Sequence, residues 1–263
     1  MKIAIFETDH PISQTVCRSI AGTCGFDLYN YGKNAPNLHR YDAVIGYGIL
    51  RGMKELYASH PHWFEIDKGF TDAEHYTGNY RLSYKGTQPI YEAGAPQANH
   101  GEVSPGRHTG YTLICPPTDA VCGFFGINLR DWATEAFTEA TIFGGECLFR
   151  TKGDTTPIEW DEIDKLVTFN SSLGFEALRR CIPVVSDPIH STIGSYQKNA
   201  IDPSDMNGLF SFASAHQFKL GDKEGIHWIL KRYLSGSATI QEKQSLPMSA
   251  STRYFVGQPP KQI

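Results

Sequence analysis

The chain has 263 residues, of which 40% are hydrophobic and 20% are charged, as in a globular protein with one large or two smaller domains. Its formal net charge of −4, with 24 basic residues, argues against a large nonspecific nucleic-acid surface but allows a local basic cleft. There is no apolar run of about eighteen residues for a transmembrane helix, and MKIAIFETDH lacks the apolar core and cleavage site of a signal peptide, so a cytoplasmic protein is expected.

The first half of the chain predicts an open sheet of buried strands connected by helices. We expect strands at 2–6, 26–31, 42–46 and 62–67 and helices at about 13–21 and 49–58. Ligands of such sheets bind at the carboxyl ends of the strands. Asp9 and His10 follow the first strand and are therefore candidate catalytic groups. Capping of the loop by Asp9, with His10 simply exposed to solvent, is the alternative.

The loop after the third expected strand is rich in glycine. Gly46 and Gly48 allow the backbone to approach a ligand closely, whereas Gly52 lies one position too late for the dinucleotide-binding fingerprint. Tyr47 and Arg51, in and beside this loop, are candidate contacts for an acceptor substrate.

Two acidic residues lie on the fourth expected strand. Side chains alternate between the faces of a strand, so Glu65 and Asp67 point to the same face, where one could act as a base or orient the other. An ion pair of Asp67 with Lys68 or Arg81 is the structural alternative. Arg81 is also a candidate contact for the acceptor.

The next segments predict a hairpin and then a linker. Residues 80–84 alternate between apolar and polar side chains, which predicts a half-buried strand, with 90–91 pairing back to it. Residues 92–108 are rich in Gly, Pro, Asn and His and predict the connection between two domains. His108 is a candidate contact for a phosphate or an acceptor, and a solvated side chain is the alternative.

The second half predicts a further α/β unit. We expect strands at 111–115, 147–150, 166–169 and 184–185, helices at 129–140 and 224–234, a loop at 191–196 and an irregular or short helical segment at 210–217. Asn128 is a suitable cap for the first of these helices. Arg150 and Lys152 follow a strand, where two cations suit a monophosphate or a diphosphate.

The segment LVTFNSSLGFEALRRCIPVVSD, residues 166–187, has the pattern strand, polar loop, helix, strand. Asn170, Ser171 and Ser172 are helix-capping residues, and Gly174 allows close approach of a ligand. Free N–H groups at such a helix start suit a phosphate, and Glu176 in the first turn could accept a ribose hydroxyl. A plain βαβ unit with a good helix cap is the alternative.

The motif N-S-S-x-G-F-E-A-L-x-R-x-x-P-V-V within this segment resembles the nucleotide-sugar end of capsule-polysaccharide glycosyltransferases. The resemblance covers about twenty residues. It implies a GT-B fold, in which two Rossmann-like domains enclose a cleft. The corresponding division is an acceptor domain at 1–108, a donor domain at 109–234 and a tail at 235–263.

The resemblance also implies roles for individual residues. The segment D-K-G-F, starting at Asp67, looks like a short acidic motif of the family, but Lys68 stands where some relatives carry a second acid. Relatives have Arg-x-His-Pro near Arg150, and this chain lacks the His-Pro. The implied donor-binding residues are Arg150, Lys152, Asn170, Ser171, Ser172, Gly174, Glu176, Asp187 and His190.

These observations predict a nucleotide-sugar-dependent glycosyltransferase. The absence of a D-x-D motif suggests a metal-independent enzyme, with no cofactor beyond the nucleotide-sugar co-substrate. The acceptor is either a glycan or, as in short phage-encoded transferases, a hydroxymethylated base in DNA. The alternatives are a non-catalytic nucleotide- or glycan-binding module and a sugar epimerase of GT-B shape. The six cysteines form no C-x-x-C pair and are expected to be free thiols.

Overall fold

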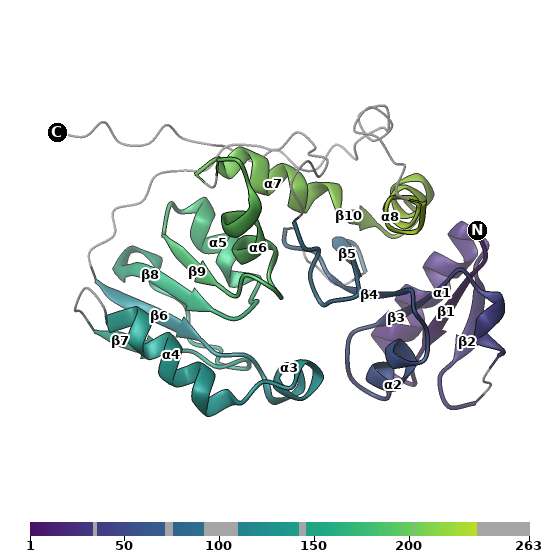
Figure 1. Cartoon of the computed structure of the whole chain (residues 1–263), viewed down its shortest axis with the longest axis horizontal. Coiled ribbons are helices and arrows are strands. Elements are labelled where there is room, and N and C mark those ends of the chain that lie inside the picture. The colour runs from purple at the N-terminus through teal and green to yellow at the C-terminus, as the bar shows by residue number, and fades with distance from the viewer. Residues whose placement is uncertain (34–35, 72–75, 92–109, 142–145, 203, 236–263) are drawn as a thin grey trace. The chain divides into compact units, whose positions relative to one another are not determined.

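The computed structural model describes residues 1–33, 36–71, 76–91, 110–141, 146–202 and 204–235 (Figure 1). The described chain forms two compact units. The first contains residues 1–90 and 211–235, and the second contains residue 91 and residues 110–210. The expected linker at 92–108, with His108, and the tail after 235 lie outside the described residues.

The first unit is built on a six-stranded sheet with the order β10-β5-β4-β3-β1-β2. The strands are β1 (Ile3–Glu7), β2 (Asp27–Asn30), β3 (Ala43–Tyr47), β4 (Trp63–Lys68), β5 (Asn79–Tyr84) and β10 (Gln217–Lys219). Strands β1 to β4 are parallel, and β5 pairs antiparallel with both β4 and β10. Its helices are α1 (Pro11–Cys24), α2 (Met53–Ala58) and α8 (Lys223–Ser235), with a 3-10 turn η1 (Leu38–Arg40).

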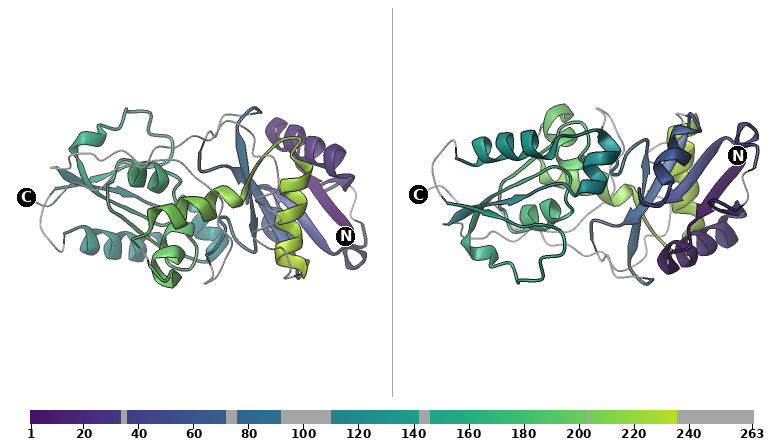
Figure 2. Two further views of the ribbon diagram at one scale, coloured as in Figure 1. Left: turned by 90° about the horizontal axis from the view of Figure 1, so that it is seen from above. Right: turned by 90° about the horizontal axis from the view of Figure 1, so that it is seen from below.

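Continuous apolar runs form the central strands because both faces of this sheet are covered. The core between the sheet and the helices α1 and α8 includes Ile5, Ile45 and Phe64 from the strands and Ile20 and Ile229 from the helices. Right-handed crossovers place α1 and α2 on opposite faces of the sheet, as the views of Figure 2 show.

Two expectations for the neighbourhood of β5 were wrong. Strand β5 is not half-buried, because Arg81 and Ser83 on its expected solvent side are 6% and 0% exposed. Residues 90–91 do not pair back to β5, whose second neighbour is β10. Residues 211–234 were expected in the donor domain, yet they pack in the first unit because β10 pairs with β5 and α8 packs beside α1.

The second unit is built on a four-stranded parallel sheet with the order β7-β6-β8-β9. Its strands are β6 (Tyr111–Cys115), β7 (Cys147–Phe149), β8 (Ile163–Thr168) and β9 (Val184–Ser186). Its helices are α3 (Asp119–Phe125), α4 (Leu129–Thr141), α5 (Leu173–Arg179), α6 (Thr192–Asn199) and the start of α7 (Met206–Ala215), with a 3-10 turn η2 (Trp160–Glu162). Helix α4 lies on one face of the sheet and α5 and α6 on the other (Figures 1 and 2).

The expected cap of α4 is confirmed, since Asn128 Oδ1 accepts the N–H groups of Arg130 at 2.9 Å and Asp131 at 3.4 Å. The expected loop at 191–196 was wrong, because Ser191 caps helix α6 and accepts the N–H of Gly194. The segment 210–217 contains the end of the short helix α7, in line with the expected irregular or short helical segment, and the start of β10.

The six cysteines are free, as expected, and four of them are buried. Among the described helices, none is long and apolar enough to cross a membrane.

Candidate functional site

Strand order places one preferred ligand position in each unit. A crevice opens at the carboxyl ends of two neighbouring parallel strands whose following connections leave in opposite directions. In the first unit these strands are β1 and β3, and in the second unit they are β6 and β8. Polar side chains that follow these strands are therefore the first candidates for chemistry.

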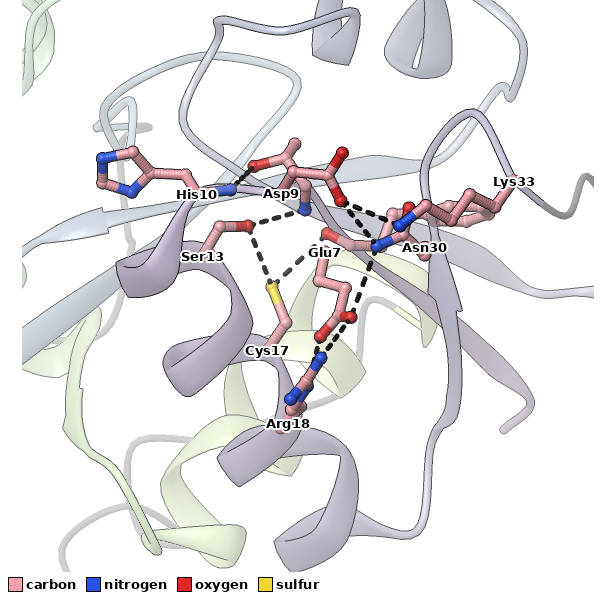
Figure 3. A network of polar contacts seen from close by, with 10 residues as sticks. Glu7, Asp9, His10, Ser13, Cys17, Arg18, Asn30 and Lys33 are labelled. Carbon is pink, nitrogen blue, oxygen red and sulfur yellow. Dashed lines mark hydrogen bonds and ion pairs between the residues drawn. The ribbon is translucent and has the colours of Figure 1, made fainter.

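The residues after β1 form a network of ion pairs and hydrogen bonds (Figure 3). Lys33 Nζ lies 3.2 Å from Asp9 Oδ1, and Asn30 Nδ2 donates to the same oxygen at 3.3 Å. These hydrogen bonds from Lys33 and Asn30 hold the pKa of Asp9 below its ordinary value. The ring of His10 points away from Asp9 in Figure 3, and only the His10 backbone N–H contacts Thr8 Oγ1. The side chains of Asp9 and His10 therefore do not point toward the same place.

Glu7 is the buried anion of the same network, and the sequence analysis missed it. Arg18 from α1 binds both of its carboxylate oxygens, at 2.7 Å and 2.8 Å. Hydrogen bonding by Arg18, against the opposing effect of burial, lowers the pKa of Glu7. Its position at the carboxyl end of β1, where ligands of such sheets bind, could have identified Glu7 as a candidate.

The Glu7 pair predicts a pH-dependent contribution to stability. Because the folded-state pKa of Glu7 is lowered, its pairing with Arg18 stabilises the fold above the unfolded value of 4.5 and ceases to do so as the pH falls through the lowered pKa. We expect Arg18→Gln to lower the free energy of unfolding at pH 7 but not at pH 2.5, in urea titrations at both pH values. A deficit of equal size at both pH values would contradict the assignment. Lys33→Gln, which removes an exposed partner, is the control.

A second cluster joins β4 to β5. Arg81 donates to Asp67 Oδ2 at 2.7 Å, to the carbonyl of Thr87 at 3.1 Å and to the carbonyl of Lys68, and its guanidinium lies 5.1 Å from the ring of Phe70. The ion pair that the sequence analysis considered as an alternative is therefore present. Arg81 is 6% exposed, so its main contacts are internal to the protein rather than with an acceptor.

Glu65 lies on the same strand as Asp67 and is 2% exposed. Burial, assisted by the charge of Asp67, raises the pKa of Glu65 well above its ordinary value, and Arg81 opposes this only in part. Its Oε2 atom is buried and has no hydrogen-bond partner in the described part of the chain. Glu65 therefore retains a proton at pH values where an exposed glutamate has lost it, which is the property of a general acid.

The other acceptor-side candidates differ in environment. Tyr47 is half-buried at the end of β3, and burial raises its pKa. Arg51 is exposed and adopts a left-handed backbone conformation with φ of 58°. After burial, the charge of Asp67 is the next cause of the raised pKa of Tyr47, so these two side chains interact electrostatically. Among the described contacts, none joins Arg51 to Asp67.

In the second unit, Asp187 and His190 form a pair in the loop after β9. Asp187 Oδ1 accepts the backbone N–H of Ile189 at 2.9 Å and that of His190 at 2.7 Å, and lies 2.9 Å from His190 Nδ1. Burial favours the neutral acid, but the hydrogen bond from His190 and the two backbone N–H groups outweigh it, and the pKa of Asp187 is lowered. The imidazole is thus oriented by an ionised carboxylate.

Three segments meet at the His190 ring. Its centroid lies 4.4 Å from that of Phe125, at the end of α3, and 5.3 Å from that of Phe169, which directly follows β8. His190 itself follows β9, and its Nε2 atom has no hydrogen-bond partner among the described residues and is not buried. The sequence analysis did not identify Phe125 or Phe169 as site residues. Phe169 could have been identified because it directly follows an expected strand, whereas nothing in the sequence marks Phe125.

The Ser-rich loop lies after β8, as expected, but its side chains mainly close the loop. Thr168 Oγ1 accepts the N–H of Ser171 at 3.2 Å, and Ser171 Oγ accepts the N–H of Leu173 at 3.2 Å. Ser172 stands at the helix start without capping it through its side chain, and Asn170 precedes both serines.

Gly174 is explained by packing. A Cβ atom at this position would lie 2.6 Å from Cδ1 of Ile193, so the missing side chain lets α5 and α6 approach each other. The residue is buried within α5, where it serves that contact between the two helices.

Three other donor-side candidates are engaged locally or exposed. Glu176 accepts from Arg180 at 2.7 Å and from Arg179 at 3.3 Å, so both of its oxygens have partners. Arg150 donates to the carbonyls of Thr156 and Asp154 at 2.7 Å and 2.8 Å, within its own loop. Lys152 is exposed. No group of His, Cys, Asp or Glu suited to a metal ion occurs among the residues described.

Comparisons with known proteins give a distant structural likeness. No family model matches the chain, and no curated protein matches it. Sixteen chains of solved structures are similar, including KpsC of Thermosulfurimonas dismutans, a beta Kdo 2,7 transferase. The TM-score is 0.50 with 10% sequence identity, over 86% of this chain and 94% of KpsC. The two chains therefore share a mixed α/β, Rossmann-like fold.

Proposed function

We propose that this protein is a glycosyltransferase that takes its sugar from a nucleotide-sugar donor. The observation that carries the proposal is the Asp187–His190 pair, which stands where the carboxyl ends of β8 and β9 approach Phe125. The distant likeness to KpsC supports the reaction class through the fold. The GT-B arrangement of the two units is part of this proposal.

On the donor side, His190 supplies the group that the reaction most needs. A leaving nucleotide develops negative charge, and the oriented ring of His190, when it carries a proton on Nε2, donates to that charge. Asp187 holds the ring by its Nδ1 atom and keeps Nε2 directed away from the loop. The rings of Phe125 and Phe169 offer flat apolar surfaces beside it, suited to a nucleobase.

The polar loop after β8 completes the donor site in this proposal. Asn170 and Ser171 provide hydrogen bonds for the ribose or the phosphates. Glu176 would bind a ribose hydroxyl only by giving up its contacts with Arg179 and Arg180, so we assign the ribose to the loop instead.

On the acceptor side we propose that Asp67 and Glu65 supply the acid–base groups. Asp67 accepts a hydrogen bond from Arg81, and Glu65 retains a proton through burial. A buried carboxyl group that keeps its proton suits the acid role, and the carboxylate held by Arg81 is the candidate base. The acceptor itself is proposed to be a glycan, with hydroxymethylated DNA as the second substrate to assay.

The proposal is tested by donor binding. We expect a UDP-, GDP-, CMP- or ADP-linked sugar, or nucleotide-activated Kdo, to raise the melting temperature of the protein, since a ligand at about 100 times its Kd adds roughly 2.7 kcal/mol of stability. His190→Ala should weaken that donor by at least about tenfold, because a charged hydrogen bond contributes roughly 1.5–3 kcal/mol. Titration calorimetry gives the Kd, and chromatography of donor and acceptor gives turnover.

Ile189→Ala is the matched control, because this residue lies in the same loop and its side chain is 61% exposed. Its donor affinity should equal that of the unmodified protein. If no donor raised the melting temperature, or if His190→Ala bound the donor with unchanged Kd, the proposed donor site would be disproved. Donor binding without transfer or hydrolysis would identify a binding module instead.

A further inference from the structure

The amino edge of the first sheet contains a hollow of about 740 Å³. Asp42 directly precedes β3 and His62 directly precedes β4, and Lys231 and Ser235 contribute from the last turns of α8. The candidate groups after β1 and β3 lie at the other end of these strands, about 17 Å away at 3.3 Å per residue. The hollow is therefore separate from the ligand position at the carboxyl edge, and its volume suits a small molecule.

His62 presents a fixed imidazole in this hollow. Its Nδ1 atom lies 2.7 Å from the hydroxyl of Tyr84, and its ring stacks on the ring of Tyr84, which in turn stacks on Tyr233 with centroids 5.0 Å apart. The Nε2 atom of His62 is not buried and has no hydrogen-bond partner among the described residues. In the tautomer whose Nδ1 accepts from the Tyr84 hydroxyl, the Nε2–H group is a donor for a ligand.

His60 makes the adjoining wall rigid. It is 7% exposed, with Nδ1 2.6 Å from the carbonyl of His62 and Nε2 3.2 Å from the carbonyl of Tyr41. Its ring thereby ties together the segments that lead into β3 and β4. Because both nitrogens are occupied by backbone groups, His60 contributes shape rather than a ligand contact.

The charges around the hollow favour an anion. Lys231 and His39 line it together with His62, and Lys2 and Arg40 lie against the ring of Tyr41, at 5.1 Å and 5.9 Å. The chain as a whole carries a net charge of −4, so this local excess of cationic and imidazole groups is a distinctive feature of the hollow.

An acceptor group lies in the same hollow. Asp42 contributes a carboxylate, one oxygen of which accepts the backbone N–H of Lys2 at 2.6 Å. The donors His62 and Lys231 suit a phosphate, and the carboxylate of Asp42 beside them suits a hydroxyl group. A ligand that carries both groups therefore matches the hollow.

We propose that this hollow is a second binding site, for a small phosphorylated sugar. The phosphate binds His62 and Lys231, and a hydroxyl group of the sugar donates to Asp42. The site lies within the first unit and is independent of the proposed donor site at His190.

The experiment is titration calorimetry of the whole chain with three probes: glucose 6-phosphate, inorganic phosphate and glucose. We expect glucose 6-phosphate to bind at least tenfold more tightly than either of the others. Lys231→Gln, on the protein surface, and His62→Gln should each weaken it about tenfold. Lys223→Gln removes the same charge from the other end of α8 and should leave the Kd unchanged, and the imidazole resonance of His62 should shift on binding.

Each of three outcomes overturns the proposal. If glucose 6-phosphate does not bind, the proposed site does not exist. If inorganic phosphate binds with the same affinity, the site does not recognise the sugar. Binding that is lost in His190→Ala but retained in Lys231→Gln places the ligand at the proposed donor site instead.

Discussion

Replacing Arg81 by leucine is expected to reduce the free energy of unfolding of the first unit by about 2–4 kcal/mol. The side chain of Arg81 is 8% exposed and donates to Asp67 and to the carbonyls of Thr87 and Lys68. Leucine keeps the apolar stem but removes the donor that these three acceptors share. The carboxylate of Asp67 is 41% exposed and can turn to water, whereas a carbonyl left unpaired in the interior costs about its full desolvation penalty. Amide hydrogen exchange of β4 and β5 reports the loss at the strands concerned.

Lys33→Leu is the control for Arg81→Leu. It also breaks an ion pair with an aspartate, but in the Asp9–Lys33 pair the side chains are 73% and 64% exposed. Solvent already screens such a pair, so no measurable loss of stability is expected. If the two variants unfolded at the same denaturant concentration, burial would not be what makes Arg81 important. The outcome bears on function as well, because Arg81 orients Asp67.

Replacing Gly194 by alanine should destabilise the second unit by about 2–3 kcal/mol, the typical cost of adding volume where neighbours cannot move. A Cβ atom here would lie 2.3 Å from the carbonyl oxygen of Asp187 and 2.5 Å from that of Ser186. Both atoms belong to the backbone, so α6 must move away from the loop after β9. Because that loop also carries His190, donor affinity should fall together with stability. Urea denaturation and donor titration measure the two effects.

Gly123→Ala provides the matched comparison. Gly123 lies within α3 of the same unit, and a Cβ atom there would meet nothing within 4 Å. Alanine is favoured over glycine in a helix by up to about 1 kcal/mol, so this variant should be neutral or stabilised. Equal destabilisation by the two substitutions would mean that the contact of Gly194 with the loop does not limit the packing of α6.

The candidate site was only partly predictable from the sequence. The positions of His190, Asp187 and the Ser-rich loop after strands follow from local patterns, because polar residues that interrupt an apolar run mark strand ends. The burial of Glu65 and Arg81 does not follow from local patterns. For Arg81, the alternation of apolar and polar residues in β5 predicts a solvent-exposed side chain. That face of β5 is covered in the fold, and the contact partners of Arg81 extend from Asp67 to Thr87.

Gly174 and Glu176 also show that the sequence does not reveal which groups are already in contact with the rest of the protein. Gly174 in the Ser-rich segment suggests room for a ligand, yet its neighbour is Ile193 of α6. Glu176 at a helix start suggests a free carboxylate, yet Arg179 and Arg180 of its own helix bind it. A pattern in the sequence identifies which residue types a ligand would need. It does not show which of them are already occupied by the protein.

The sequence by itself determined the parallel strands of both units and most of their helices. Runs such as Ile3–Glu7 and Ala43–Tyr47 are apolar on both faces, and only a doubly covered strand accommodates them. Tertiary structure alone decided where residues 211–235 belong. Strand β10 has three residues, and its pairing with β5 joins positions more than 130 apart in the chain, as with Gln217 and Arg81. A contact of such range leaves no periodic signal, because it is selected by the free edge of a sheet that exists only once the first unit has folded.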